Sequence, residues 1–180
     1  MAHALNQRQR ALLLAAVAVL ALLAVTAVGL LLHDKAMVTD FSRKNLPPSL
    51  AYPFGTDWMG RDMLSRTLTG LSLSIRIGVL TAAVSAVVAL ALGTAAATLG
   101  RWVDAALSWC IDLVMGIPHI LLVMLISLAF GKGFVGVVAG VSLSHWTSLA
   151  RLLRGEVLQL RNAPYVLMAE KLGRTRLQVV

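Results

Sequence analysis

The sequence predicts an all-α protein, a polytopic transmembrane bundle of helices. Four stretches are almost entirely apolar, with Asp112 as their only acid: residues 11–32, 77–99, 105–130 and 134–150. A helix needs about 20 apolar residues to cross the ~30 Å hydrocarbon core of a bilayer. Lipid offers no partner to backbone N–H and C=O groups, so each stretch should be helical. Only 13% of the residues are charged, against about 25% in a soluble domain.

The basic residues do not form a nucleic-acid-binding face. The net charge is +8, but the Lys and Arg residues lie between the apolar stretches instead of clustering with aromatic residues, as a nucleic-acid groove requires. Cys110 is the only cysteine, so it has no intrachain disulfide partner, and no Cys/His spacing suits zinc. The bilayer is therefore the expected environment, and neither nucleic acid nor a cofactor is expected.

The elements follow in order along the chain. Residues 1–10 are polar and basic, and the first span, 11–32, is longer than a signal-peptide core of about 7–15 residues, which favours an uncleaved anchor. Residues 33–70 form a long polar connection, 71–153 hold three further spans, and 154–180 form a polar, basic closing segment. The distribution of Lys and Arg favours two cytosolic termini, which makes 33–70 extracytoplasmic.

The closing segment predicts a short amphipathic helix. Pro164 suits a first helical turn, and Gly173 suits a helix end. Between them one apolar stripe recurs with helical spacing: Tyr165, Met168, Ala169 and Leu172. Such a helix either lies on the lipid surface or docks in a groove of a cytosolic partner.

A motif in the long connection resembles a known family. Residues 54–66 read FGTDWMGRDMLSR and are similar to the F-G-T-D-x-x-G-R-D-x-x-S-R signature of C-type permease subunits of oligopeptide, dipeptide and nickel ABC importers. The matching residues are Phe54, Gly55, Thr56, Asp57, Gly60, Arg61, Asp62, Ser65 and Arg66. We expect Asp57 and Asp62 to pair with Arg61 and Arg66 and to clamp the entrance of the second span, a structural role in preference to substrate chemistry.

The closing segment resembles the cytoplasmic coupling-helix region, or "EAA" loop, of ABC importer permeases. The usual Glu-Ala-Ala reads Leu167, Met168, Ala169 here, so the acid is absent. The resemblance implies that an ATPase contacts Tyr165, Val166, Ala169, Leu172 and Gly173. Arg151, Arg154 and Arg161 are expected to anchor the loop at the membrane surface.

The resemblance also implies an assembly. The family has a six-span type I importer fold, of which four spans are expected here, so Val180 is interpreted as the end of a partial chain. The implied partners are a second permease, two cytosolic ABC ATPases and an extracytoplasmic binding protein, in a bacterial inner membrane. The implied cargo is a di- or oligopeptide, or nickel or a metal chelate. The sequence lacks a phosphate-binding loop, so we expect separate subunits to hydrolyse ATP and this chain not to be an enzyme.

Some residues inside the spans allow more than one interpretation. An intramembrane carboxylate is costly, so Asp112 either pairs with Arg101 or a C-terminal arginine, or acts in the pathway or a gate. Pro118 predicts a kink that could serve such a gate. His119 and His145 do not require a metal, and backbone carbonyls are their expected partners. Two other classes stay open: a non-transport assembly protein, and an intramembrane enzyme that uses Asp112 and both histidines.

Overall fold

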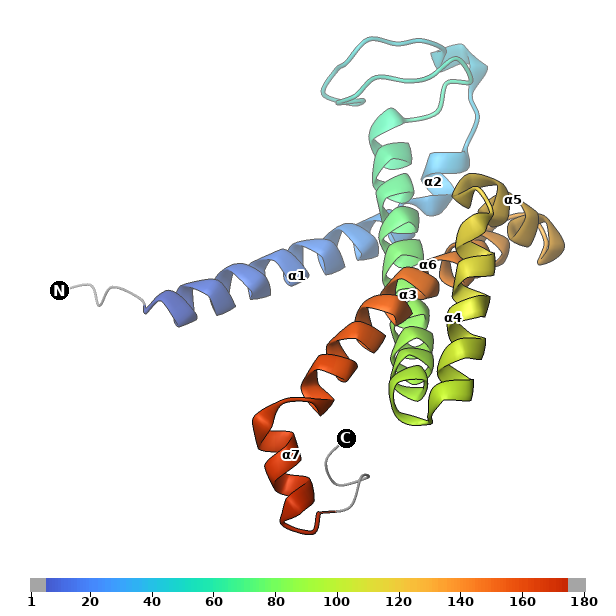
Figure 1. Cartoon of the computed structure of the whole chain (residues 1–180). Coiled ribbons are helices and arrows are strands. Elements are labelled where there is room, and N and C mark those ends of the chain that lie inside the picture. Colours follow the sequence, from blue (N-terminus) through green and yellow to red (C-terminus); the bar gives the residue numbers. More distant parts are fainter. Residues whose placement is uncertain (1–5, 175–180) are drawn as a thin grey trace. The chain divides into compact units, whose positions relative to one another are not determined.

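The computed structural model describes residues 6–174, apart from the side chains of Leu167 and Glu170. The outermost parts of the predicted terminal segments, 1–5 and 175–180, lie outside the described residues. The helices are α1 (Gln7–Leu31), α2 (His33–Met37), the 3₁₀ helix η1 (Phe41–Arg43), α3 (Met63–Thr98), α4 (Arg101–Gly116), α5 (His119–Ala129), α6 (Phe134–Arg161) and α7 (Pro164–Lys171) (Figure 1). No β-strand occurs in the described part, which confirms the all-α prediction.

The chain divides into two compact units, Met1–Gly78 and Val79–Val180, and α3 runs through the boundary. In the first unit, α1 packs against the beginning of α3 through a glycine. A Cβ atom on Gly29 would lie 2.5 Å from the Cβ of Ser72. The Ser72 hydroxyl donates to the carbonyl of Thr26 at 3.0 Å, and the Thr69 hydroxyl donates to that of Gly29 at 3.2 Å. Small residues of this kind let helix backbones approach closely in lipid.

In the second unit, α3, α4 and α6 share a core. It consists of Ala89, Ile111 and Ala150, with Trp146 and Leu153 packed against it. Its buried aliphatic residues come one from each helix, so this core fixes the three helices to one another.

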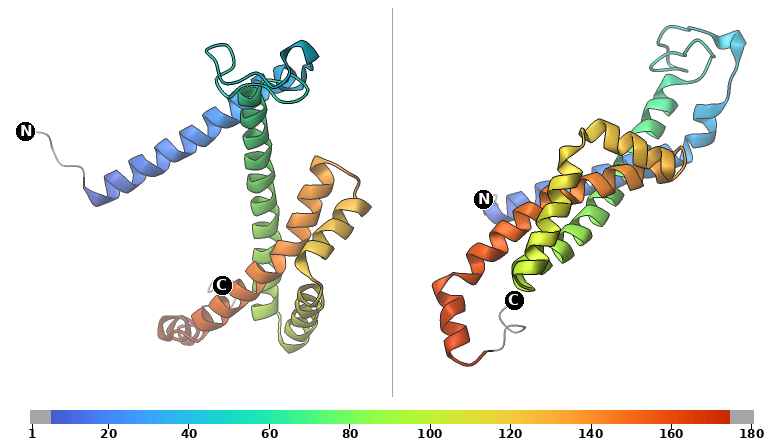
Figure 2. Two further views of the ribbon diagram at one scale, coloured as in Figure 1. Left: turned by 90° about the horizontal axis from the view of Figure 1, so that it is seen from above. Right: turned by 45° about the vertical axis from the view of Figure 1, so that its right-hand side comes forward.

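The helices α5 and α6 pack side by side as a hairpin (Figure 2). Their contact uses two glycines of α6. A Cβ atom on Gly140 would lie 2.7 Å from the Val123 carbonyl oxygen, and the Ser127 hydroxyl donates to the carbonyl of Gly136 at 2.9 Å. The close approach leaves no room for larger residues at these positions.

The predicted span at 105–130 is not one helix. It forms α4 and α5, whose axes are bent by 96°. Ile117 has extended backbone angles, φ −87° and ψ 133°, because the ring of Pro118 disfavours the helical conformation in the residue before it. Proline also has no N–H to continue the helical ladder, so the predicted kink is a full break.

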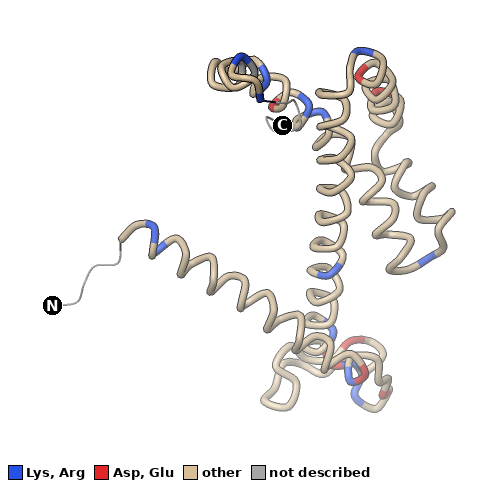
Figure 3. Tube along the Cα trace, turned by 90° about the horizontal axis from the view of Figure 1, so that it is seen from below, with Lys and Arg blue, Asp and Glu red and all other residues tan. Residues whose placement is uncertain are grey.

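In the described part, two helices, α1 and α3, are long and apolar enough to cross a membrane. The number of candidate spans rises to three if the bent α4–α5 pair counts as a single span. The helix that contains the second predicted span, α3, begins at Met63, inside the segment predicted as a connection; where the span itself starts stays a prediction. The fourth predicted span lies in α6, which is not among these candidates, and its crossing stays a prediction. Charged residues gather in the loop before α3 and towards helix ends (Figure 3).

Candidate functional site

The loop that carries the FGTD motif depends on two glycines in the left-handed region. Gly55 has a φ of 69° and Gly60 a φ of 74°. A Cβ atom on Gly55 would lie 2.5 Å from the carbonyl oxygen of Leu46, and one on Gly60 would overlap the carbonyl oxygen of Asp40. Both positions therefore need glycine for conformation and for space.

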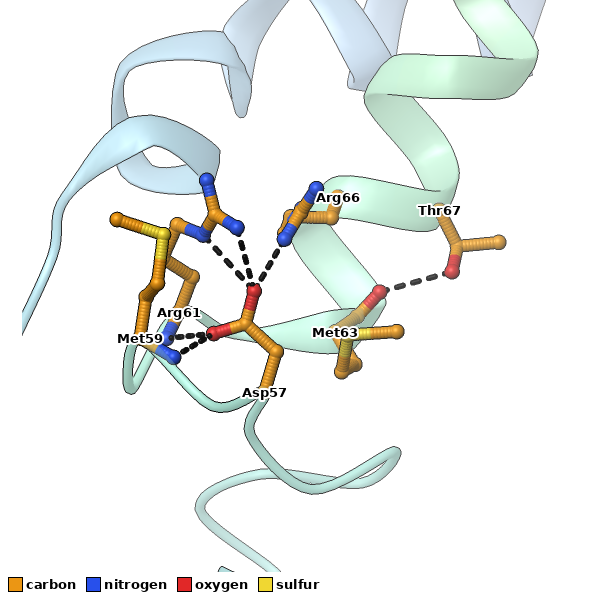
Figure 4. Close-up of polar contacts among 6 residues, drawn as sticks. All are labelled: Asp57, Met59, Arg61, Met63, Arg66 and Thr67. Carbon is orange, nitrogen blue, oxygen red and sulfur yellow. Dashed lines mark hydrogen bonds and ion pairs between the residues drawn. The ribbon is translucent and has the colours of Figure 1, made fainter. Parts of the chain in front are cut away.

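Asp57 is the polar centre of this loop (Figure 4). Its Oδ1 accepts hydrogen bonds from the backbone N–H groups of Met59 and Arg61, both at 2.9 Å. Its Oδ2 accepts from Nε of Arg61 at 2.8 Å and also contacts the guanidinium of Arg66. One carboxylate thus fixes a turn and ties it to the first turns of α3 through charge-assisted hydrogen bonds.

Asp62 has a different partner from the one expected. Its Oδ1 accepts from the N–H of Leu64 at 3.1 Å, which caps the N-terminus of α3. Its Oδ2 accepts from the Ser65 hydroxyl at 2.7 Å and lies 3.0 Å from Nζ of Lys35. The expected pairing is therefore only partly present. Asp57 contacts both arginines, whereas Asp62 pairs with Lys35, which lies outside the motif.

The remaining motif residues complete the loop. The Thr56 hydroxyl accepts from the N–H of Leu46 at 2.8 Å and donates to the carbonyl of Arg43. Phe54 is exposed. The polar contacts described for the motif thus stay within the first unit, which fits a structural role for the loop.

Acid titration should reveal the Asp57 contacts. Although burial raises the pKa of this carboxyl, the hydrogen bonds from Arg61 and Met59 outweigh it and lower the pKa to about 2. Because the folded pKa lies below the unfolded value of about 3.9, the contribution of Asp57 to stability is complete above pH 4 and is lost as the pH falls through 2. The ¹³C NMR signal of the Asp57 carboxyl, assigned with Asp57→Asn, should titrate near pH 2. A midpoint near 3.9 would contradict the hydrogen-bond network.

Three arginines of α6 contact neighbouring helices. Arg151 pairs with Asp112 of α4, and Nη2 of Arg154 donates to Asp104 of α4 at 2.6 Å. Arg161 donates to the carbonyl of Ala97, in the last turn of α3, where helix carbonyls lack intrahelical N–H donors. The residues predicted as membrane-surface anchors thus join α6 to α4 and α3.

The pairing of Asp104 with Arg154 was missed by sequence reasoning. A weak signal was present: Asp104 and Asp112 are eight residues apart on one helix, which places them about 80° apart around its axis, within one broad helical stripe. For Asp112, the expected alternative of pairing with a C-terminal arginine matches the contact with Arg151.

The break between α4 and α5 borders a cavity of about 470 Å³. Its lining comes from the break, including Met115, Pro118 and His119, and from α6, including Ser144 and His145. The imidazole rings of His119 and His145 lie side by side, with their centroids 4.9 Å apart. A second cavity of about 370 Å³, between α3 and α6, also has His145 in its wall. Sequence spacing gave no indication that the two histidines meet.

The expected amphipathic helix is present as α7. It begins at Pro164, and Gly173 follows its end with a φ of 85°. The N–H of Arg174 donates to the carbonyl of Ala169 at 3.2 Å, the bond that closes a Schellman cap. Three residues of the apolar stripe are exposed, Tyr165 at 64%, Met168 at 64% and Leu172 at 84%, while Val166 and Ala169 are half-buried.

The three groups that the alternative intramembrane-enzyme interpretation needs do not come together. In the part of the chain that the structure describes, no three His, Cys, Asp or Glu residues are placed to hold a metal ion. Asp112 pairs with Arg151, whereas the two histidines meet each other. The intramembrane-enzyme interpretation needed all three groups to converge, and this arrangement gives it no support.

Long apolar helices, a broken helix beside a cavity and an exposed terminal helix are features of a helical membrane transport protein. Residues 88–180 match the family described as "Binding-protein-dependent transport system inner membrane component". The chain belongs to this family, whose members are transport components, and this membership confirms the prediction that the chain is not an enzyme.

The similar proteins are permeases of the peptide type. The chain is 32% identical over 139 residues to the dipeptide transport system permease protein DppC of Bacillus subtilis, covering 77% of this chain and 43% of that protein. It is 34% identical over 139 residues to the oligopeptide transport system permease protein OppC of the same organism, covering 74% and 46%. It is 32% identical over 148 residues to the probable D,D-dipeptide transport system permease protein DdpC of Escherichia coli, covering 82% and 49%. The chain spans about half the length of these relatives.

Proposed function

We propose that this chain acts as a permease subunit of an ATP-driven importer in a bacterial inner membrane and forms part of its translocation pathway. Its partners would be a second permease, two cytosolic ATPases and an extracytoplasmic binding protein. The names of the similar proteins favour di- or oligopeptides as cargo over nickel or a metal chelate. The observation that carries this proposal is the exposed apolar stripe on α7 together with the arginine contacts of α6.

The arrangement suggests how a force on α7 would reach the membrane. Only Asn162 and Ala163 separate α7 from α6, which is a continuous helix from Phe134 to Arg161. A continuous helix moves as a rigid body, and packed cores shift between discrete arrangements instead of deforming gradually. The pairs at Arg151 and Arg154 would pass the displacement of α6 to α4, whose far end borders the cavity at the helix break.

The sidedness of these contacts agrees with the proposed topology. The end of α3, the beginning of α4 and the end of α6 come together through Arg161 and Arg154. They therefore lie at one end of the second unit, the end from which α7 extends. This agrees with a cytosolic location for the closing segment and a docking role for Tyr165, Val166, Ala169, Leu172 and Gly173.

Replacing Met168 by glutamate should uncouple transport. The side chain is exposed, so the change costs little folding stability, but a carboxylate would be buried unpaired against an apolar groove of the ATPase. Hot-spot residues of such interfaces contribute about 2 kcal/mol or more, so uptake by proteoliposomes containing the complete importer should fall more than tenfold. Less ATPase should also co-purify with the permease.

Lys171→Gln is the matched control, because Lys171 is exposed on the same short helix but off the apolar stripe. It should leave uptake and ATPase recovery near the native level. Normal uptake by Met168→Glu would refute the docking role of the apolar stripe.

A further inference from the structure

Two histidines line the cavity at the break between α4 and α5. The coupling movement proposed above gives them no role. His119 is the first residue of α5, and His145 lies on α6 within Phe134–Arg161. The centroids of their rings are 4.9 Å apart, with an angle of 54° between the ring planes. Both residues line the same cavity of about 470 Å³.

The spacing of the rings suits one metal ion between them. Zinc and similar ions bind imidazole nitrogen at about 2.0–2.1 Å, so two nitrogens on one tetrahedral ion lie about 3.3 Å apart. A ring nitrogen lies roughly 1 Å from the ring centre, so centroids 4.9 Å apart allow two nitrogens to reach that separation by rotation of the side chains.

The rest of the cavity wall selects the kind of ion. Met115 and the hydroxyl-bearing Ser144 and Ser148 line it, and no carboxylate is among the lining residues that the structure describes. Imidazole and thioether ligands favour borderline and soft ions, whereas Mg²⁺ and Ca²⁺ need carboxylate and carbonyl oxygens. Two protein nitrogens leave coordination positions for water or for a ligand group of the cargo.

We propose that His119 and His145 form a two-imidazole site for a borderline divalent transition-metal ion such as Zn²⁺. The site lies where the helix is broken, and it faces a cavity instead of a closed core. The site goes beyond the proposed importer role, because binding requires neither an ATPase nor a binding protein.

The test is a Zn²⁺ titration of the purified chain in detergent, without a polyhistidine tag and with His3→Ala to remove the histidine near the amino terminus. We expect one Zn²⁺ per chain and no Mg²⁺ binding. His119→Ala and His145→Ala should each weaken Zn²⁺ binding by about tenfold or more, since even the loss of an outer-shell partner costs about 10–100-fold. Bound Co²⁺ should give visible absorption that either change abolishes.

His33→Ala is the matched control, because His33 lies on α2 in the first unit, and it should leave the Zn²⁺ affinity unchanged. Helical circular dichroism and elution volume identify any variant that has not folded, and His145→Asn then replaces His145→Ala. Binding that survives both histidine changes, or an absence of stoichiometric binding to the native chain, would overturn the site. Uptake by the complete importer is measured separately, so failure here leaves the importer role standing.

Discussion

Alanine in place of Gly60 is expected to unfold the loop before α3 and to abolish uptake by the complete importer. Gly60 has a φ of 74°, and an added Cβ atom would overlap the carbonyl oxygen of Asp40. The left-handed conformation costs an L-residue about 1–2 kcal/mol, and forcing an extra group into a packed site costs about 1–3 kcal/mol more. The backbone of Asp40 is the obstacle, so a change of rotamer cannot relieve the overlap.

Limited trypsin digestion measures this change, because Arg43 and Lys44 lie exposed in the same loop and the protease cuts beside them only when the loop backbone opens. Gly70→Ala is the matched control: a Cβ atom there meets nothing within 4 Å, and a helical alanine gains about 1 kcal/mol over glycine. Equal trypsin resistance of the two variants would contradict the described packing of Gly60 against Asp40.

Reversing the charge of Arg154 should uncouple α6 from α4. Arg154→Asp leaves Asp104 facing a second acid, and the two native side chains retain only 31% and 29% exposure. Removing one partner of a fully buried pair costs about 3–5 kcal/mol, and partial exposure reduces this to about 1–3 kcal/mol. We expect uptake to fall at least tenfold, with the chain still inserted in the membrane.

The reciprocal change supplies the decisive control. The double variant Arg154→Asp with Asp104→Arg restores an ion pair of opposite orientation, and it should recover most of the uptake. Recovery isolates the pairwise interaction, in the sense of a double-mutant cycle. If the double variant were as inactive as Arg154→Asp, the contact would have no part in coupling and Arg154 would act elsewhere.

The fold class was predictable because lipid leaves few choices to an apolar segment. Uncharged runs such as 11–32 must be helices in any arrangement of the chain, and Pro164 and Gly173 marked the limits of α7 by their own backbone preferences. The role of Asp57 was predictable because its contacts are local: its partners Arg61 and Arg66 lie four and nine residues further along the chain. The close approach of Gly60 to Asp40 joins residues further apart and was not predictable from the motif alone.

Most contacts between distant segments were not predictable, although pairing of Asp112 with a C-terminal arginine was one of the expected alternatives. Lys35 meets Asp62, and His119 meets His145, only because helices pack in a way that no local pattern records. The size of the break at Pro118 was also beyond sequence reasoning, since a proline kinks a helix in one setting and interrupts it in another. The bend of 96° depends on the hairpin that α5 forms with the glycine face of α6.

The break between α4 and α5 has a consequence for ion leakage. The last carbonyls of a helix and the first N–H groups of the next lack intrahelical partners, and hydrocarbon cannot supply them. If α4 and α5 lie at membrane depth, these groups need water in the adjoining cavity or polar side chains of its wall, such as Ser144 and Thr147, as partners. A hydrated cavity at that depth would shorten the path for protons and small ions, so the proposed importer would need a separate dry barrier to preserve the potential across its membrane.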